Sequence, residues 1–154
     1  MVLIHQRLYS KDQLVGIDSK EYLEALTKDI FETHQFKNEV LPYKLNIEPI
    51  VLSIETITPI GLILNELIVN VLKHAYTTIA PESILSVDFR KNNDELLLKV
   101  SDNGNGFEGE IKDSSFGIKL MKALSKKLKA ELNYASSVNN GTEVILTIKK
   151  FEIL

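Results

Sequence analysis

The sequence has no cysteine, so disulfide bonds and thiolate metal sites are excluded. This absence fits a reducing compartment, and we expect a cytoplasmic location, with attachment to a membrane left open for the full-length protein. A surplus of basic residues is lacking as well. The formal net charge is −3, so no broad basic field favours nucleic acid, and we expect no nucleic-acid partner.

Long apolar runs are also missing. No uninterrupted stretch approaches the roughly 20 residues of a membrane span, and we expect no membrane contact from this segment. The first residues, MVLIHQRLYSK, are too short and too interrupted for a signal peptide. They look like the middle of a longer protein, and we expect the chain to be a fragment. Its 154 residues suffice for one domain with a single core, and the 44% apolar and 25% charged content is ordinary for a globular protein.

The most informative stretch is Pro59 to Tyr76, PIGLILNELIVNVLKHAY. Thr58 is the expected N-cap, and Pro59 would be the first helical residue, where proline is tolerated. Apolar residues lie on nearly every side of this predicted helix, which is typical of a buried helix. Four polar residues fall within a wedge of about 100° at helical spacing; they are Glu66, Asn70, Lys73 and His74. The wedge is either a solvated edge or a polar stripe that needs polar partners.

A second stretch, LLLKVSDNGNG, favours the polar stripe. An apolar strand runs into Asp102, which Gly104 and Gly106 follow. This places a carboxylate where the chain must turn sharply and let a ligand approach closely. Asp-Asn-Gly is also an ordinary turn, so the motif gains specificity only from the Glu-x-x-x-Asn helix about 30 residues earlier.

Together these motifs resemble the GHKL ATPase family, which includes DNA gyrase, heat-shock chaperones, mismatch-repair proteins and histidine kinases. Within it, the chain looks most like the catalytic, ATP-binding domain of a sensor histidine kinase whose N-box ends in Lys-His-Ala-aromatic. LILNELIVNVLKHAY resembles the N-box, VSDNGNGF the first glycine box, FGIKLMKALSKKL the second and the Gly-Thr of NNGTEVILTI the third. The resemblance covers nearly the whole chain in the right order.

Periodicity along the chain predicts an α+β fold, a two-layer sandwich with helices on one face of a mixed sheet. Asp18 is expected to begin a helix, with Glu21 as capping-box partner and an end near His34. Residues 116–129 are expected to form a second amphipathic helix with its lysines in solvent. The expected strands cover residues 14–17, 44–47, 50–53, 84–90, 95–101, 131–135 and 143–150.

The resemblance divides the chain into residues 1–11, the tail of the dimerisation and phosphoacceptor hairpin, and residues 12–154, the ATP-binding catalytic domain. His5 is read as a helix-surface histidine and not as the phosphoacceptor, because the family places that histidine on the preceding helix. Residues 107–115 resemble a short ATP lid. We expect slow or absent turnover by this chain alone, and a dimer or higher oligomer in the full-length protein.

The resemblance implies ATP and Mg²⁺ as cofactors. Mg²⁺ takes hard oxygen ligands and keeps several waters, which suits the lone amide oxygen of Asn70 as metal ligand. The alternative for Asn70 is a buried amide that satisfies nearby backbone. Glu66, one turn earlier, is a general base, a water ligand or an orienting group, and the sequence does not choose. Lys73, and less strongly His74, would contact phosphate oxygens and offset charge in the transition state.

By the same resemblance Asp102 accepts a hydrogen bond from the exocyclic amine of adenine, a match that guanine does not offer. Gly104 and Gly106 would leave room for base and sugar, and Thr142 would reach Asp102 or adenine directly or through water. Ser115 and Gly117 open the helix after the lid, where free N–H groups bind phosphate. Many family members have two glycines there and this chain has one, so its phosphate contacts depart from the pattern.

The function that this resemblance implies is transfer of the ATP γ-phosphoryl group to a histidine outside this segment, with a response regulator as downstream partner. Two alternatives stay open. One is an anti-sigma-factor-type serine kinase or another GHKL ATPase that works as a nucleotide-regulated interaction protein. The other is a binding module without nucleotide, which the presence of Asn70, Asp102, Gly104, Gly106 and Gly117 disfavours.

Overall fold

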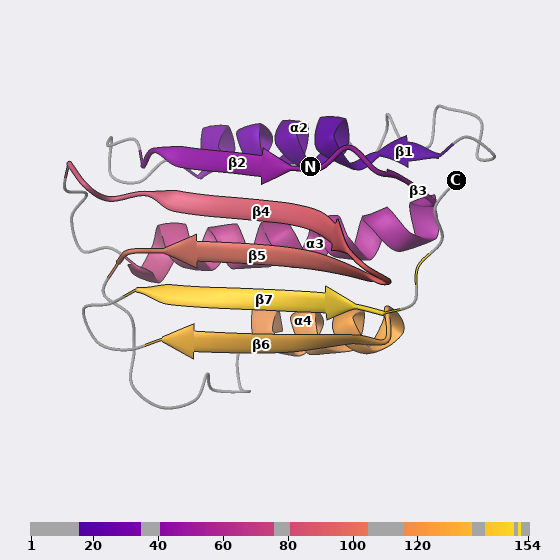
Figure 1. The fold of residues 1–154 in the computed structure, drawn as a ribbon. Coiled ribbons are helices and arrows are strands. Elements are labelled where there is room, and N and C mark those ends of the chain that lie inside the picture. Colours follow the sequence, from indigo (N-terminus) through magenta and orange to yellow (C-terminus); the bar gives the residue numbers. More distant parts are fainter. Residues whose placement is uncertain are drawn as a thin grey trace.

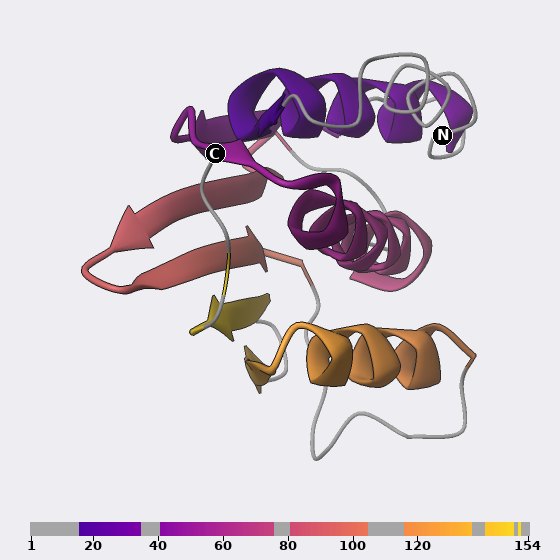
Figure 2. The ribbon, with the colours of Figure 1, turned by 90° about the vertical axis from the view of Figure 1, so that its right-hand side faces the viewer.

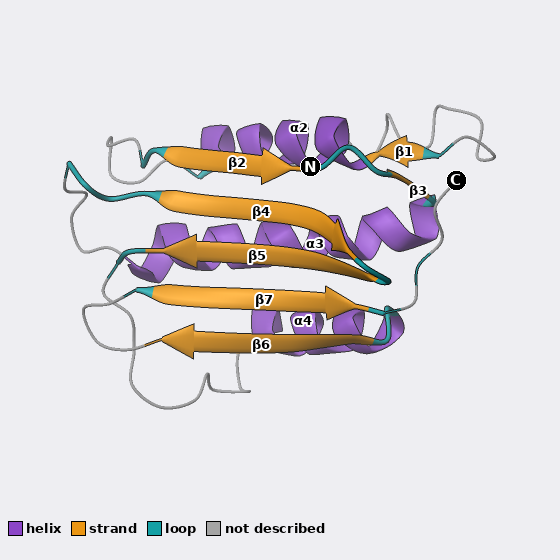
Figure 3. Ribbon diagram, in the orientation of Figure 1, coloured by secondary structure: helices purple, strands orange, loops and turns teal. Residues whose placement is uncertain are grey.

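The computed structural model describes residues 16–34, 41–75, 81–104, 116–136, 141–149 and 151. Figure 1 shows the arrangement of the elements and Figure 3 separates helices from strands. The helices are α2 (Ser19–Thr33), α3 (Ile54–Asn70), which continues into the π-helical turn η1 (Val71–Ala75), and α4 (Phe116–Lys127). The strands are β1 (Ile17–Asp18), β2 (Tyr43–Ile47), β3 (Val51–Leu52), β4 (Leu85–Asn92), β5 (Glu95–Asp102), β6 (Ala130–Ser136) and β7 (Thr142–Ile148).

Five strands form one mixed sheet in the order β2-β4-β5-β7-β6. β2 pairs with β4 in parallel, and the other neighbours are antiparallel. β1 and β3 form a separate two-stranded antiparallel ribbon. The three helices lie on one side of the main sheet (Figure 2). The predicted α+β sandwich with helices on one face is therefore confirmed.

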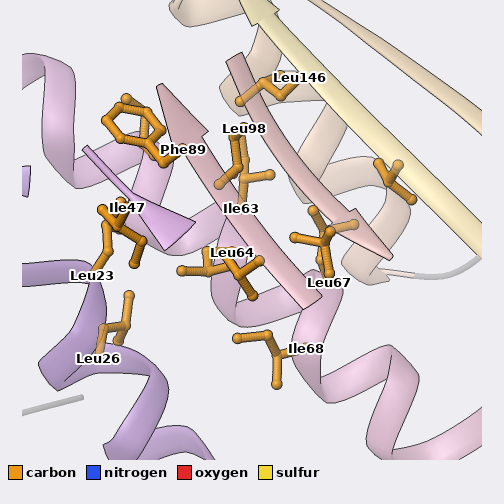
Figure 4. Packing of buried hydrophobic residues seen from close by; sticks show 14 of the residues in the cluster. Leu23, Leu26, Ile47, Ile63, Leu64, Leu67, Ile68, Phe89, Leu98 and Leu146 are labelled. Carbon is orange, nitrogen blue, oxygen red and sulfur yellow. The ribbon is translucent and has the colours of Figure 1, made fainter. Parts of the chain in front are cut away.

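The core lies between the helices and the sheet. Alternation along the strands fixes which side chains point into it, because successive residues of a strand face opposite sides. On β4 and β5 the inward residues are at most 3% exposed, whereas the residues between them are half-buried or exposed. Figure 4 shows residues from both layers meeting in this core, among them Leu23, Leu26, Ile47, Ile63, Leu64, Leu67, Ile68, Phe89, Leu98 and Leu146.

Helix α2 begins as the sequence predicts. Asp18 is its N-cap, and one carboxylate oxygen accepts a hydrogen bond from the N–H of Glu21 at 3.1 Å. The helix ends at Thr33, with His34 as C-cap. It packs closely on α3, because a Cβ on Gly61 would lie 2.5 Å from the hydroxyl of Tyr22. Gly61 thus permits the approach of the two helices.

The predicted start of the organising helix is wrong. α3 begins at Ile54, with Ser53 as N-cap, and Pro59 lies inside the helix. The Ser53 hydroxyl accepts from the N–H of Thr56 at 3.3 Å and lies 2.9 Å from the Thr56 hydroxyl. Pro59 has no N–H to donate to the carbonyl of Glu55, four residues earlier. Glu55 is exposed in the first turn of α3, and the loss is limited to this one hydrogen bond.

Among the described residues, Ile54–Lys73 is long and apolar enough to cross a membrane by length and composition alone. This differs from the expectation based on uninterrupted runs, because the helix reaches that length with its polar residues included. Of its most apolar 18-residue window, 61% is buried inside the domain. A core helix passes the same test, and α3 lies between α2, α4 and the sheet in Figure 2.

Candidate functional site

Two residues of the predicted polar wedge, Glu66 and Asn70, lie in the C-terminal part of α3. Glu66 and Asn70 are half-buried on a helix whose other faces are largely buried. They are four residues apart, so they occupy one face, one turn from each other. Both side chains carry oxygen atoms, and neither side chain is fully buried. Half-burial is compatible with both readings of the wedge, a solvated edge and a polar stripe that needs polar partners.

The helix changes character directly after Asn70. Residues Val71–Ala75 form a π-helical turn, and the N–H of Val71 is shared between the carbonyls of Leu67 and Ile68. A π turn is wider than an α turn, so the rotation per residue is smaller. The uniform α-helical spacing that grouped Lys73 and His74 with Glu66 and Asn70 is therefore wrong at this point. Lys73 is exposed, and the side chain of His74 lies outside the described part of the chain.

Asp102 ends β5 and lies between two neighbouring strands. In register it faces Leu85 of β4 on one side and Thr142 of β7 on the other. It has the same strand parity as the core residues Leu98 and Val100, so it belongs to the helix-facing side of the sheet. The sequence-predicted partners Asp102 and Thr142 are thus brought together by strand pairing.

The carboxylate of Asp102 is half-buried and partly compensated. Burial raises its pKa above the ordinary value of 3.8, and backbone N–H groups of Gly104 and Thr142 oppose the rise by hydrogen bonding to the ionised form. The Gly104 N–H lies 2.8 Å from Oδ1. The carboxylate accepts hydrogen bonds from these two backbone N–H groups while staying partly accessible, which suits a group that must also accept from a ligand.

Gly141 allows the start of β7 to approach Asp102 closely. Its φ of 78° is a conformation that favours glycine, and a Cβ there would overlap the carbonyl oxygen of Asp102. This geometry explains why a glycine directly precedes Thr142 in the sequence. Glycine allows the close approach, and Thr142 follows it directly opposite Asp102. Gly104 is buried on the other flank of the turn.

Sequence reasoning missed Asn103. Its side-chain oxygen accepts from the N–H of Ile84 at 2.9 Å, and its side-chain nitrogen donates to the carbonyl of Glu82 at 2.6 Å. These bonds fasten residues 82–84, which precede β4, to the end of β5. The available signal was an asparagine in a turn directly after a strand-ending aspartate, but its distant partners could not be read from the sequence.

The remaining predicted residues are placed less fully. Gly117 is the second residue of α4, in its first turn, as expected for a helix opening. Gly106 and Ser115 lie outside the described residues, as do residues 107–115 of the predicted lid and residues 1–11. In Figure 1 the C-terminal ends of α3 and β5 and the first residues of β4 and β7 lie at the same, left-hand end of the domain. Asn70 and the Asp102 cluster therefore share one end of the fold.

The donor atoms at this end suit a hydrated divalent cation more than a fully liganded one. No cluster of three or more His, Asp or Glu side chains able to hold a metal is present in the described ranges. Asn70 and Glu66 supply hard oxygens from adjacent turns, and Mg²⁺ in proteins often takes one or two such ligands and completes its shell with water and phosphate. These residues fit that ion.

The chain matches a known protein family. Residues 55–152 match the family model described as histidine kinase-, DNA gyrase B- and HSP90-like ATPase. No curated protein sequence matches the chain at a significant level.

Solved structures share the fold. The histidine kinase domain of the Erythrobacter litoralis EL346 blue-light activated histidine kinase has a TM-score of 0.81 at 21% identity, over 96% of this chain and 70% of that one. The Erythrobacter litoralis EL346 blue-light activated histidine kinase itself has a TM-score of 0.78 at 23% identity, over 86% of this chain and 42% of that one. The mycobacterial sensor histidine kinase MprB has a TM-score of 0.65 at 13% identity, over 86% of this chain and 95% of that one.

Proposed function

Because residues 55–152 match its model, the chain belongs to the histidine kinase-, DNA gyrase B- and HSP90-like ATPases, and from this premise we propose that it is the catalytic domain of a sensor histidine kinase. Membership implies a domain that binds ATP. The finer assignment is supported by the fold shared with histidine kinase structures over most of the chain.

The observation that carries the proposal is the environment of Asp102. Its carboxylate ends a central strand, is half-buried, and is held by the Gly104 N–H at 2.8 Å. In its ionised form it is an acceptor only, so it would select adenine by accepting from the exocyclic amine. Thr142 lies beside it in register and would support the same contact directly or through water.

The phosphate end of ATP would lie toward Asn70. We assign Asn70 as the Mg²⁺ ligand, with Glu66 one turn earlier orienting bound water or the incoming nucleophile. Mg²⁺, when bound, would neutralise charge on the phosphate oxygens. Exposed Lys73 can reach an anion from the π-helical turn and would offset charge that develops during phosphoryl transfer.

Gly106, Ser115, Gly117 and His74 remain assigned to the nucleotide site by sequence. The acceptor would be the imidazole of a histidine on the phosphoacceptor hairpin, which is already a nucleophile when neutral. A response regulator would then take the phosphoryl group. We place this activity in the cytoplasm.

A calorimetric titration with a non-hydrolysable ATP analogue tests the proposal. We expect binding that Mg²⁺ strengthens, and we expect Asp102→Asn to weaken it about 10- to 100-fold, the effect of losing a hydrogen bond to a charged group worth about 1.5–3 kcal/mol. Asp94→Asn is the matched control, because Asp94 is exposed in the turn between β4 and β5. A folded wild-type chain that binds no ATP analogue would refute the proposal.

A further inference from the structure

The pairing of β4 with β5 stops at Asp102. The antiparallel register runs from Asn92 opposite Glu95 to Leu85 opposite Asp102. One residue beyond, Asn103 lies opposite Ile84. Here the Asn103 side chain makes hydrogen bonds to the backbone of the segment before β4. Its Oδ1 accepts from the Ile84 N–H at 2.9 Å, and its Nδ2 donates to the Glu82 carbonyl at 2.6 Å.

A carboxamide can do this because it is planar and offers both an acceptor and donors, like a peptide group. The Asn103 side chain thus extends the pairing with the segment before β4, while its backbone is released from the strand direction. The released backbone turns, and the next N–H, that of Gly104, comes back to Oδ1 of Asp102 at 2.8 Å. An aspartate at position 103 would place a carboxylate oxygen, which cannot donate when ionised, against the Glu82 carbonyl oxygen.

The opposite side of Asp102 is fixed by β7. Gly141 approaches the Asp102 main chain closely, and the Thr142 backbone N–H bonds to its carboxylate. On the β4 side the register partner of Asp102 is Leu85, whose side chain is apolar. The turn at residues 102–104 is therefore anchored to the β4 side through the amide of Asn103.

We propose that Asn103 is a positioning residue for nucleotide selection, which sets the Asp102 carboxylate by tying the turn after β5 to residues 82–84. The inference rests on the proposed function, since it assumes that Asp102 reads the base. Asn103 acts through Asp102 and Gly104, and both heteroatoms of its amide are engaged by backbone groups. Its removal should loosen the base contact while the sheet remains formed.

The test compares binding of ATP and GTP analogues by calorimetry to the wild-type chain and to Asn103→Ala. We expect about tenfold weaker ATP binding and a preference for ATP over GTP that falls by a similar factor. A substitution that only lowered the stability of the fold would leave this preference unchanged in a sample below its unfolding transition. Asn133→Ala is the matched control, because Asn133 is an exposed strand asparagine on β6, and we expect no change.

Hydrogen exchange at the Ile84 amide provides a second readout, which should become faster in the variant. If Asn103→Ala does not fold, Asn103→Ser replaces it, since a hydroxyl on that short arm cannot reach both partners. If the folded variant binds the ATP analogue as tightly as the wild type does and keeps the same preference for ATP over GTP, the role of Asn103 is overturned and the proposed function is not. A wild-type chain that binds neither analogue overturns the proposed function and this inference together.

Discussion

Asp102 meets two opposing requirements in one carboxyl group. Its proposed role as a hydrogen-bond acceptor for adenine needs the ionised form, yet burial raises its pKa and disfavours that form. The backbone N–H groups of Gly104 and Thr142 offset part of the penalty. A carboxylate that is charged and partly removed from water makes the folded state less stable than an uncharged group at the same position would. Such costly arrangements are typical of ligand-binding sites.

The sign of this effect can be measured through pH. Because the pKa is higher in the folded chain, the folded state binds the proton more tightly than the unfolded state. The resulting stability is fully present below the ordinary pKa of 3.8 and is lost as pH rises through the raised value. Asp102→Asn cannot ionise, so we expect its stability relative to wild type to increase from acidic to neutral pH. Urea unfolding across this range measures the difference.

The control for the pH series is Asp94→Asn, at the exposed hairpin turn. Its stability should not acquire the same pH-dependent gain. Parallel stability curves for wild type and Asp102→Asn would mean that the carboxyl group is not penalised by burial.

At the scale of elements, the start of α3 shows how two acceptable helix signals compete. Thr58-Pro59 reads as a cap followed by a first-turn proline, and Ser53 five residues earlier reads equally well. The structure uses Ser53, and the turn that this adds buries Thr56 and Ile57. Thr58 instead lies inside the helix, and its hydroxyl is buried with no hydrogen-bond partner among the described residues.

The two residues make a matched pair of substitutions. We expect Ser53→Ala to lower the free energy of unfolding by about 1 kcal/mol, because a helix N–H loses its cap. Thr58→Ala should be neutral or stabilising, because it removes a buried hydroxyl that makes no hydrogen bond in the described structure. Urea denaturation of both variants decides the matter, and the reverse order of effects would restore Thr58 as the cap.

The π-helical turn is a second feature of this element with functional weight. It lies directly after Asn70 and changes the direction in which Lys73 leaves the helix. Such turns are rare and are often found at functional sites. Here the turn separates the metal-ligand candidate, which is half-buried, from a lysine that is exposed.

At the scale of the whole molecule, the candidate site is assembled from parts distant in sequence. Asn70 comes at the end of α3, Asp102 at the end of β5 and Thr142 at the start of β7. These three positions are brought to one end of the domain by the packing of α3 on the sheet and by the pairing of β5 with β7. A ligand that touches all three parts should therefore stabilise the fold as a unit.

We accordingly expect the Mg²⁺ complex of the ATP analogue, at a hundredfold excess over its Kd, to raise the free energy of unfolding by about 2.7 kcal/mol. For a domain of this size that corresponds to an increase in Tm of roughly 5–10 °C. Scanning calorimetry measures it. Asp102→Asn at the same ligand concentration should show a clearly smaller increase.

A surface variant serves as the control. Lys149→Ala removes only the exposed ion pair with Glu131 at 3.5 Å, which should contribute little, and it should retain the full ligand-dependent increase. An equal increase in Tm for Asp102→Asn and wild type would place the ligand elsewhere.

The sequence by itself determined most of the elements and the position of Asp102 at the end of a strand. Alternation from Leu85 to Phe89 and helical spacing around Met121 reflect burial on one side, and the structure buries Leu85, Val87, Phe89 and Met121. The cap at Asp18 depends on contacts three residues away, so it too was predictable. Such features are local, because periodicity and capping depend on near neighbours in the chain.

Only the tertiary structure decided the features that join distant segments. The parallel pairing of β2 with β4, the bonds from Asn103 to residues 82–84 and the approach of Gly141 to Asp102 link residues that are about 20 to 40 positions apart. The cap at Ser53 and the π turn after Asn70 were likewise seen only in the structure. A local pattern specifies which faces are buried, whereas the partners of those faces are chosen by the packing of the whole chain.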